Sequence, residues 1–451
     1  MDIHLENLER RGQASPVVHS WQPRSKARGP GQPAVVWLGS RAKVLCRTVY
    51  LSVDPFLRCR FNASTGVDYT QPYALGEPIA SAGIGEVLQV GDAVRGLAPG
   101  DLVVEPFDSF PWQSVAVLEA AKVQRVPPLL ALLLPPSALL GACGQTGLTA
   151  WCGLETVGGG RPNGSDVVAV SGAAGAVGSL VGQLCKRRGA AVVGVCGSEA
   201  KVDFLQELGF DRALNRHSAD LRADLRAALL SVPQADRALG TSRSPQPADI
   251  TLYWDNVGGA VSDLVIQCMA PRSELLLCGQ ISTYDAEGDY PPPLPAESAA
   301  VVERRRIRRE RYTVVKYKHR FAPALAELCA LELRAEETVY DGLDAAPAAF
   351  IDMMGGGNTG KAVVRCSELP PPVARAAALR AWLPPALRGR LARSFVTPEA
   401  LGVGPEGRGA KGCGCWVGTD DDEPQAFALR SVALMRDSVW WMTRCEEFKS
   451  W

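Results

Sequence analysis

The chain has 451 residues, 47% of them hydrophobic, and its 48 lysines and arginines balance 48 aspartates and glutamates. A chain of this length is expected to form two or three domains with cores of their own, so it needs no disulfide or metal staple. The formal net charge of +0 provides no positive field for a polyphosphate backbone, which argues against a nucleic-acid partner.

The chain carries no predicted signal peptide or membrane span. Its first residues mix acidic and basic side chains without an apolar core. The most apolar stretch, residues 129–140, is interrupted by Pro135 and Pro136 and is shorter than the roughly 20 residues that cross a bilayer. The 13 cysteines contain no CxxC pair, the usual signature of structural zinc and redox sites. We therefore expect a cytoplasmic protein with reduced thiols and no membrane insertion.

Residues 1–41 show little periodicity, and short strand-like segments punctuated by glycine and proline follow them. The first segment runs from Ala42 to Val53, is apolar and β-branched, and ends in the turn Asp54-Pro55. Similar segments are expected at residues 84–90, 102–105 and 113–117. This spacing predicts a small, partly open β-barrel.

Beyond about residue 140 the pattern changes to an alternation of strands and helices. The apolar run Val167–Val170 leads through a glycine-rich turn into a segment with helical spacing over residues 179–188. Further strands are expected at residues 192–196, 250–254 and 274–278, and a second helix at residues 200–208. Strand, glycine turn and helix in repetition predict an α/β fold with a doubly wound parallel sheet of the Rossmann type.

The chain is then expected to return to the barrel domain. A helix, a strand, a second helix and a last strand are predicted, in that order, at residues 322–334, 338–340, 345–354 and 362–366. The expected division is into a barrel domain, a nucleotide-binding domain, the return to the barrel and an unassigned extension, at residues 1–137, 138–321, 322–367 and 368–451. The extension has a partly helical pattern near residues 373–391 and no assigned fold.

The segment Ser171–Gly178 (SGAAGAVG) stands between a predicted strand and a predicted helix. Glycines at this place allow a tight turn and a close approach of a pyrophosphate to backbone N–H groups at the positive end of the helix. The spacing is GxxGxxG rather than GxGxxG, so an ordinary packing turn is the alternative interpretation.

The end of the next strand bears on the choice of dinucleotide. Glu199 favours a free ribose hydroxyl, as in NAD, whereas Lys201 favours the 2′-phosphate of NADP, and Arg216 can add a second cation. Lys201 can equally be a solvated helix residue.

Long blocks of the sequence resemble the zinc-independent medium-chain dehydrogenase/reductase family, and within it the prostaglandin reductases. The blocks cover roughly residues 42–367 and are, in chain order, Thr48–Pro55, Thr65–Tyr69, Ser171–Gly175, Tyr253–Gly259, Leu277–Tyr284, Tyr290–Leu294 and Met353–Lys361. The resemblance implies a Rossmann domain beside a GroES-like, partly open β-barrel domain, with NADPH as the cofactor that is oxidised to NADP+.

The resemblance also implies individual site residues. The pyrophosphate would meet Ala174, Gly175, Ala176 and Val177, the 2′-phosphate Lys201 and Arg216, and the nicotinamide half Asn256 and Asn358. The cofactor cleft would be lined by Cys278, Gly279, Tyr284, Tyr312, Thr313 and Val314. The substrate would meet Tyr69, Phe107, Phe110, Trp112, Thr313, Val314 and Val315. Tyr284 falls at the family's catalytic tyrosine.

The chain departs from the family in several places. Arg216 stands where the family usually has a tyrosine, and the aromatic segment Phe107–Trp112 contains an apparent insertion. Residues 1–41 do not resemble the family's first strands, and the extension has no counterpart. None of the 4 histidines has the spacing of a zinc ligand, so we expect no metal.

The expected reaction is the NADPH-dependent reduction of an enone, with the 13,14 double bond of 15-keto prostaglandins as the substrate bond. Tyr284 would polarise the carbonyl group, and solvent would supply the proton. The alternative for Tyr284 is a packed aromatic residue in a loop.

Two other functions remain open at this stage: a quinone oxidoreductase of the same family and a non-catalytic NADPH-binding module. Tyr290–Leu294 (YPPPL) is expected to be rigid, either as a lid over a lipid chain or as a stiff linker. The expected partner is a small lipid substrate, and the expected assembly is a monomer or a homodimer.

Overall fold

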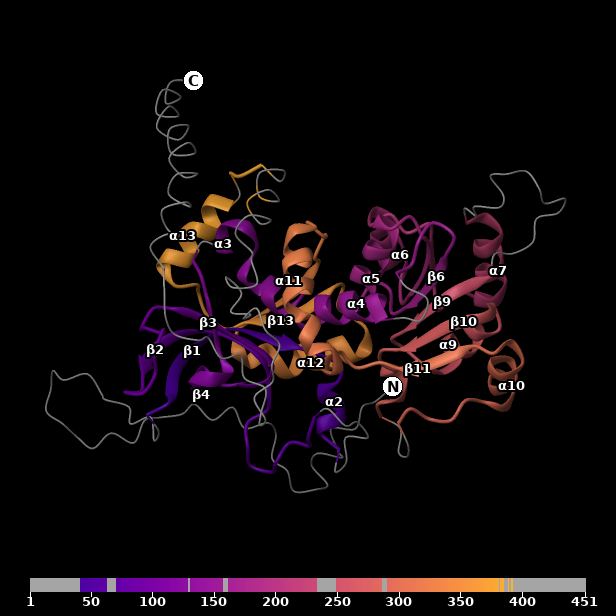
Figure 1. The fold of residues 1–451 in the computed structure, drawn as a ribbon. Helices are drawn as coiled ribbons and strands as arrows, with labels where there is room; N and C mark the ends of the chain where they lie inside the picture. The colour runs from indigo at the N-terminus through magenta and orange to yellow at the C-terminus, as the bar shows by residue number, and fades with distance from the viewer. Residues whose placement is uncertain are drawn as a thin grey trace, which may run out of the picture.

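The computed structural model describes residues 41–62, 70–128, 130–156, 161–232, 249–285, 290–380 and 382–384, together with residues 388 and 391. Within these ranges the chain forms two β-sheets, one of seven strands and one of six, with helices around them (Figure 1). The predicted α/β fold with a partly open barrel domain is confirmed.

The seven-stranded sheet belongs to the barrel domain. Its strands are β1 to β5, β12 and β13, with the bounds Lys43–Val53, Ala80–Val90, Leu102–Pro111, Val115–Glu119, Gln124–Val126, Glu337–Asp341 and Lys361–Arg365. The order is β12-β13-β1-β2-β3-β5, and β4 also pairs with β1. The central strand β1 therefore contacts β2, β4 and β13, which brings residues near position 50 beside residues near position 360.

Strand β3 is longer than predicted. It continues from Leu102 to Pro111 and remains paired with β2 across a register shift between Ser81 and Gly83. Phe110 lies against Gly83, where an added Cβ atom would come within 2.5 Å of the ring carbon Cγ. The close approach of this ring to a strand explains why glycine occupies position 83.

The six-stranded sheet is parallel throughout, with the order β11-β10-β9-β6-β7-β8. Strands β6 to β11 have the bounds Val167–Ser171, Ala191–Cys196, Arg212–Asn215, Ile250–Asp255, Met269–Leu277 and Arg308–Arg311. Strands β6 and β7 are buried along their whole length, as expected for a sheet covered on both faces.

Helices cover both faces of the parallel sheet. One face packs against α4, α5 and α6, with the bounds Gln145–Thr156, Ala176–Arg187 and Glu199–Glu207. The other packs against α7, α9 and α10, with the bounds Leu221–Ser231, Gly259–Ile266 and Ala296–Arg305. Trp254 of β9 is fully buried, and a Cβ atom at Gly153 of α4 would lie 2.3 Å from its indole ring. Gly153 therefore lets α4 pack directly on the sheet.

In the part of the chain that the structure describes, the remaining helical segments are five α-helices and five 3-10 helices. The α-helices α2, α3, α11, α12 and α13 span Leu57–Arg60, Leu130–Leu133, Phe321–Ala330, Ala346–Gly355 and Pro371–Arg380. The 3-10 helices η1 to η5 span Ala120–Lys122, Pro136–Leu140, Ile281–Thr283, Val314–Arg320 and Leu343–Ala345. Among the described residues no helix has the length and apolar character to cross a membrane.

Helix α13 shows that the extension begins as part of the barrel domain. Val373 on α13 is buried in a core cluster that also contains Ala131 of α3 and Leu139 of η2. The helical pattern noted near residues 373–391 is thus present over Pro371–Arg380, and burial against α3 stabilises it.

Candidate active site

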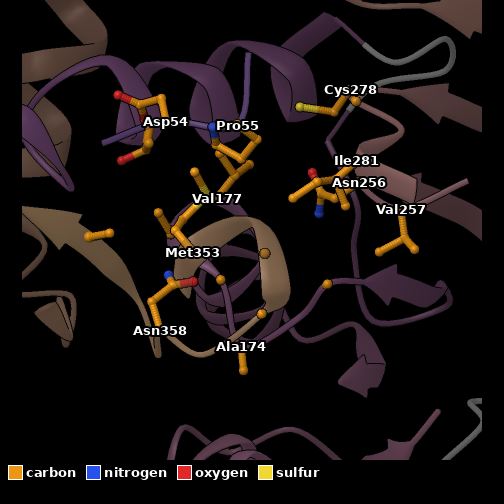
Figure 2. Close-up of a pocket in the computed structure, with 18 of the residues that line it drawn as sticks. Asp54, Pro55, Ala174, Val177, Asn256, Val257, Cys278, Ile281, Met353 and Asn358 are labelled. Carbon is orange, nitrogen blue, oxygen red and sulfur yellow. The ribbon is translucent and has the colours of Figure 1, made fainter. Parts of the chain in front are cut away.

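A cleft of about 390 Å³ lies between the two domains, where the turn after β6 faces the connection from α12 to β13. Figure 2 shows Asp54 and Pro55 on one side of this cleft and Asn256, Val257 and Cys278 on the opposite side. The structure brings to it the predicted residues Ala174, Gly175, Ala176, Val177, Lys201, Arg216, Asn256, Cys278, Gly279, Tyr284, Tyr312, Thr313, Val314, Val315 and Asn358.

The predicted aromatic substrate residues lie elsewhere. Phe110 is 0% exposed, and the Nε1 atom of Trp112 donates to Oγ of Ser81 at 2.8 Å. Phe107 packs its ring 6.2 Å from that of Phe321. These three side chains do not line the cleft. Strand β3 continues through Phe107 and Phe110 to Pro111, and Trp112 directly after it packs against the same barrel core as Phe110. Tyr69 lies outside the described residues.

The glycine-rich turn forms one end of the cleft. Gly172 has a φ of +57°, and a Cβ atom at Gly178 would lie 2.5 Å from the carbonyl oxygen of Gly172. Helix α5 can therefore begin directly beside the turn, with the positive end of its dipole facing the cleft at Ala176 and Val177. This geometry suits a pyrophosphate group.

Two cations line the cleft beside this turn. The Nζ atom of Lys201 donates to the carbonyl oxygen of Gly356 at 2.7 Å, and burial lowers the pKa of Lys201. The Nε atom of Arg216 donates to Nε2 of His217 at 3.1 Å. The carboxylate of Glu199 accepts from Nδ2 of Asn215 at 2.7 Å and does not line the cleft. Glu199, which would favour NAD, is thus outside the cleft, whereas Lys201 and Arg216, which would favour NADP, line it.

A buried carboxylate that the sequence analysis did not single out organises the wall on the nucleotide side. Asp255 is 0% exposed and ends strand β9. Its two oxygens accept hydrogen bonds at 2.9 to 3.2 Å from Ser171 Oγ, Tyr253 Oη, Val257 N, Gly258 N, Ser262 Oγ and Gln280 Nε2. The next residue, Asn256, donates from Nδ2 to the carbonyl oxygen of Ser171 at 2.8 Å. The network therefore holds the turn that presents Asn256 to the cleft.

Tyr284 follows the 3-10 helix η3 and is 8% exposed. A Cβ atom at Gly279 would lie 2.8 Å from the Tyr284 hydroxyl oxygen, so glycine at that position leaves room for the phenol. The ring of Tyr284 is 5.5 Å from that of Tyr290. Burial raises the pKa of Tyr290 to about 12, partly opposed by a hydrogen bond with Tyr284.

Cys278, which also lines the cleft, is a protonated thiol rather than a reactive thiolate. Burial raises its pKa to about 12, so the reactive thiolate is not populated near neutral pH. Within the described ranges no cluster of three or more histidine, cysteine, aspartate or glutamate side chains is arranged to hold a metal ion.

The barrel side of the cleft contains a buried ion pair. The Nζ atom of Lys361 donates to Oδ1 of Asp54 at 2.6 Å and to the carbonyl oxygen of Val53 at 2.8 Å. Both side chains are less than a tenth exposed, and the hydroxyl of Ser52 donates to the second carboxylate oxygen. The sequence pattern indicated only a turn at Asp54-Pro55, because the partner lysine is 307 positions away.

Fold and cleft together define a two-domain dinucleotide-dependent oxidoreductase, and comparison with known proteins identifies the family. Residues 176–328 match the zinc-binding dehydrogenase family, and residues 38–126 match the N-terminal domain of oxidoreductases. The chain belongs to the medium-chain dehydrogenase/reductase family.

Several members of this family are similar to most of the chain. A Bacillus subtilis protein named for NADP-dependent oxidoreductase activity is 36% identical over 333 residues, which are 73% of this chain and 89% of the relative. A 2-alkenal reductase (NADP(+)-dependent) of Nicotiana tabacum is 32% identical, with 72% and 88% covered. Prostaglandin reductase 1 of Rattus norvegicus is 31% identical, with 72% and 90% covered.

A solved structure agrees with this assignment. CurA of Vibrio vulnificus in complex with NADPH superposes with a TM-score of 0.61 at 28% identity, covering 75% of this chain and 94% of that chain.

Proposed function

We propose that the chain is an NADPH-dependent reductase of enone double bonds, and that it reduces the 13,14 double bond of 15-keto prostaglandins. The observation that carries the proposal is the placement of the Tyr284 phenol in the same cleft as the glycine turn and the two cations. The alkenal and prostaglandin reductases among the relatives support the reaction class.

The residues of the cleft fit NADPH. Lys201 and Arg216 supply the cationic donors that a 2′-phosphate requires, and the N–H groups at the start of α5 suit the pyrophosphate. Asn256 and Asn358 would hold the nicotinamide half. When bound, the cofactor supplies the hydride that is transferred to the β-carbon of the enone.

Tyr284 performs the complementary step on the carbonyl group. Negative charge grows on the carbonyl oxygen as the β-carbon is reduced, and the phenol O–H donates a hydrogen bond to that oxygen. The low exposure of Tyr284 strengthens this hydrogen bond, because water competes less in a buried site. The α-carbon takes its proton from solvent.

The test is the oxidation of NADPH by the purified chain, with 15-keto prostaglandin E2 as substrate and NADH in a parallel reaction. We expect turnover with a clear preference for NADPH, and reduction of the double bond confirmed by mass spectrometry of the product. A simple quinone serves as the competing substrate. Faster turnover of the quinone would overturn the enone assignment, and NADPH binding without turnover of any substrate would make the chain a binding module.

A further inference from the structure

An ion pair between the two domains lies at the solvent-facing edge of the cleft. Arg58 is on helix α2, two residues after Phe56, which lines the cleft. Its Nε atom is 2.5 Å from Oδ1 of Asp285. Asp285 directly follows Tyr284, so the pair connects the barrel domain to the residue beside the proposed catalytic phenol.

The residues just before Tyr284 are held by hydrogen bonds within the nucleotide-binding domain. Gln280 donates to Asp255 at 3.2 Å, and the Ser282 amide donates to the carbonyl oxygen of Val257 at 3.0 Å. The Ser282 hydroxyl donates to the same oxygen at 2.6 Å. At the other end, the contact with Arg58 comes from the opposite domain. Tyr284 therefore lies between one anchor on each side of the cleft.

Arg58 is oriented by its surroundings on α2. Its neighbours Leu57 and Cys59 are 0% and 3% exposed, and Phe61, directly after α2, packs its ring 5.6 Å from that of Phe350 on α12. The Nη1 atom of Arg58 donates to Oδ1 of Asn62 at 2.9 Å, which orients the guanidinium group. A group that is already oriented loses little entropy when it pairs. The barrel domain thus presents a prepared cation to Asp285.

A second aromatic ring covers part of the Tyr284 ring. The Tyr290 ring packs against it, and the guanidinium of Arg311 lies 5.3 Å from the centre of the Tyr290 ring. The phenol is consequently confined by ring packing on one side and by the ion pair at its neighbour.

We propose that the Arg58–Asp285 pair is a clasp that holds Tyr284 in position against the substrate carbonyl, which makes Arg58 and Asp285 positioning residues of the reaction. This inference rests on the proposed function. The side chains of Arg58 and Asp285 are 25% and 44% exposed, and a pair of that exposure shifts an equilibrium by roughly two- to five-fold. The clasp therefore adjusts the population of the productive geometry and is not needed for folding.

The experiment compares Arg58→Ala, Asp285→Ala, their double variant and the swapped double variant Arg58→Asp/Asp285→Arg. Each alanine variant is expected to lower kcat for the enone by roughly two- to five-fold with an unchanged Kd for NADPH. The double alanine variant should lose no more than either single one, and the swap should restore the rate. Added salt should lower the kcat of the parent chain toward that of Arg58→Ala and leave the kcat of that variant unchanged.

A matched control lies within the barrel domain. Arg125 pairs through Nε with Oδ1 of Asp101 at 2.9 Å and does not line the cleft. Arg125→Ala removes a pair that is joined through the same two atoms, with side chains 54% and 13% exposed, and it is expected to keep the parent rate and the parent salt dependence.

Hydrogen exchange of the amides of residues 281–285 provides a readout that needs no turnover. We expect faster exchange in Arg58→Ala and restored protection in the swapped variant. If the parent chain reduces no enone while exchange responds in this way, the proposed function and the positioning role fail, and only the structural restraint on residues 281–285 stands. Exchange equal to that of the parent in Arg58→Ala overturns the clasp, and altered exchange with unchanged kcat overturns the positioning role.

Discussion

The two walls of the cleft each bury a carboxylate, and they compensate its charge in different ways. On the nucleotide side, Asp255 accepts from six uncharged donors that all belong to its own domain. On the barrel side, Asp54 relies on the ammonium group of Lys361 and on the hydroxyl of Ser52. A shared network can lose or rearrange one member, whereas an ion pair concentrates the compensation on one partner. The barrel wall should therefore be the more sensitive to a single substitution.

The largest effect is expected from Lys361→Met, which keeps the length of the side chain and removes its charge. Asp54 is then left buried without its cation, and the loss of one partner from a buried pair costs about 3–5 kcal/mol. Urea unfolding should show this decrease in the free energy of unfolding. The double variant Asp54→Leu/Lys361→Met should recover most of the loss, and an equal loss in both variants would contradict the assigned role of the pair.

Tyr284→Phe is expected to have the next largest effect, and it tests the chemistry of the nucleotide side of the cleft. Removal of one donor to a developing oxyanion costs about 10²- to 10³-fold in kcat. The ring and its packing on Tyr290 are preserved, so the Kd for NADPH should not change. Tyr73→Phe is the control, because it removes a partly buried phenol hydroxyl that donates to the carbonyl oxygen of Ala80 at 2.7 Å and does not line the cleft. Full turnover by Tyr284→Phe would remove Tyr284 from the mechanism.

The residues of the nucleotide wall could be predicted from sequence because they follow from local patterns. The apolar run at Val167, the glycines up to Gly178 and the position of Lys201 are close together in the chain. The carboxyl ends of parallel strands also meet at one edge of a sheet, so Asn256 and Cys278 had to reach the same cleft. The fold class was predictable for the same reason.

The barrel side could not be predicted in this way, because its contacts depend on long-range strand pairing. Lys361 meets Asp54 only because β13 pairs with β1, and Arg58 meets Asp285 over 227 positions. Phe110 was expected near the substrate, but the continuation of β3 places it in the core. Neither periodicity nor motif spacing reports where a long strand ends relative to its partner.

Glu105 in β3 carries a third buried carboxyl group, and its compensation is the weakest. It is 3% exposed and accepts from the amides of Ser109 at 2.9 Å and Phe107 at 3.3 Å. Burial raises its pKa from 4.5 to about 7. Between these values the unfolded chain has lost a proton that the folded chain still holds, so the free energy of unfolding falls as the pH rises through this window.

Glu105→Gln should remove this pH dependence. The parent chain is expected to lose about 3 kcal/mol relative to the variant between about pH 4.5 and pH 7, and nothing further above it. Urea unfolding of both proteins across this range measures the difference. Parallel curves for the two proteins would show that Glu105 titrates at the same pH in the folded and unfolded chains.

Asp255→Asn is expected to have the smallest effect, although Asp255 is the most deeply buried of these carboxylates. The remaining oxygen keeps the four donors on Oδ1, and the new amide group faces Ser262 and Gln280. The Ser262 hydroxyl can turn to accept, and Gln280 can rotate its Oε1 atom, which is buried without a partner in the described structure, toward the amide. The cost should therefore be only about 1 kcal/mol in urea unfolding. In a Gln280→Met background the rotation is lost and the same substitution should cost more; an equal cost in both backgrounds would show that the network does not rearrange.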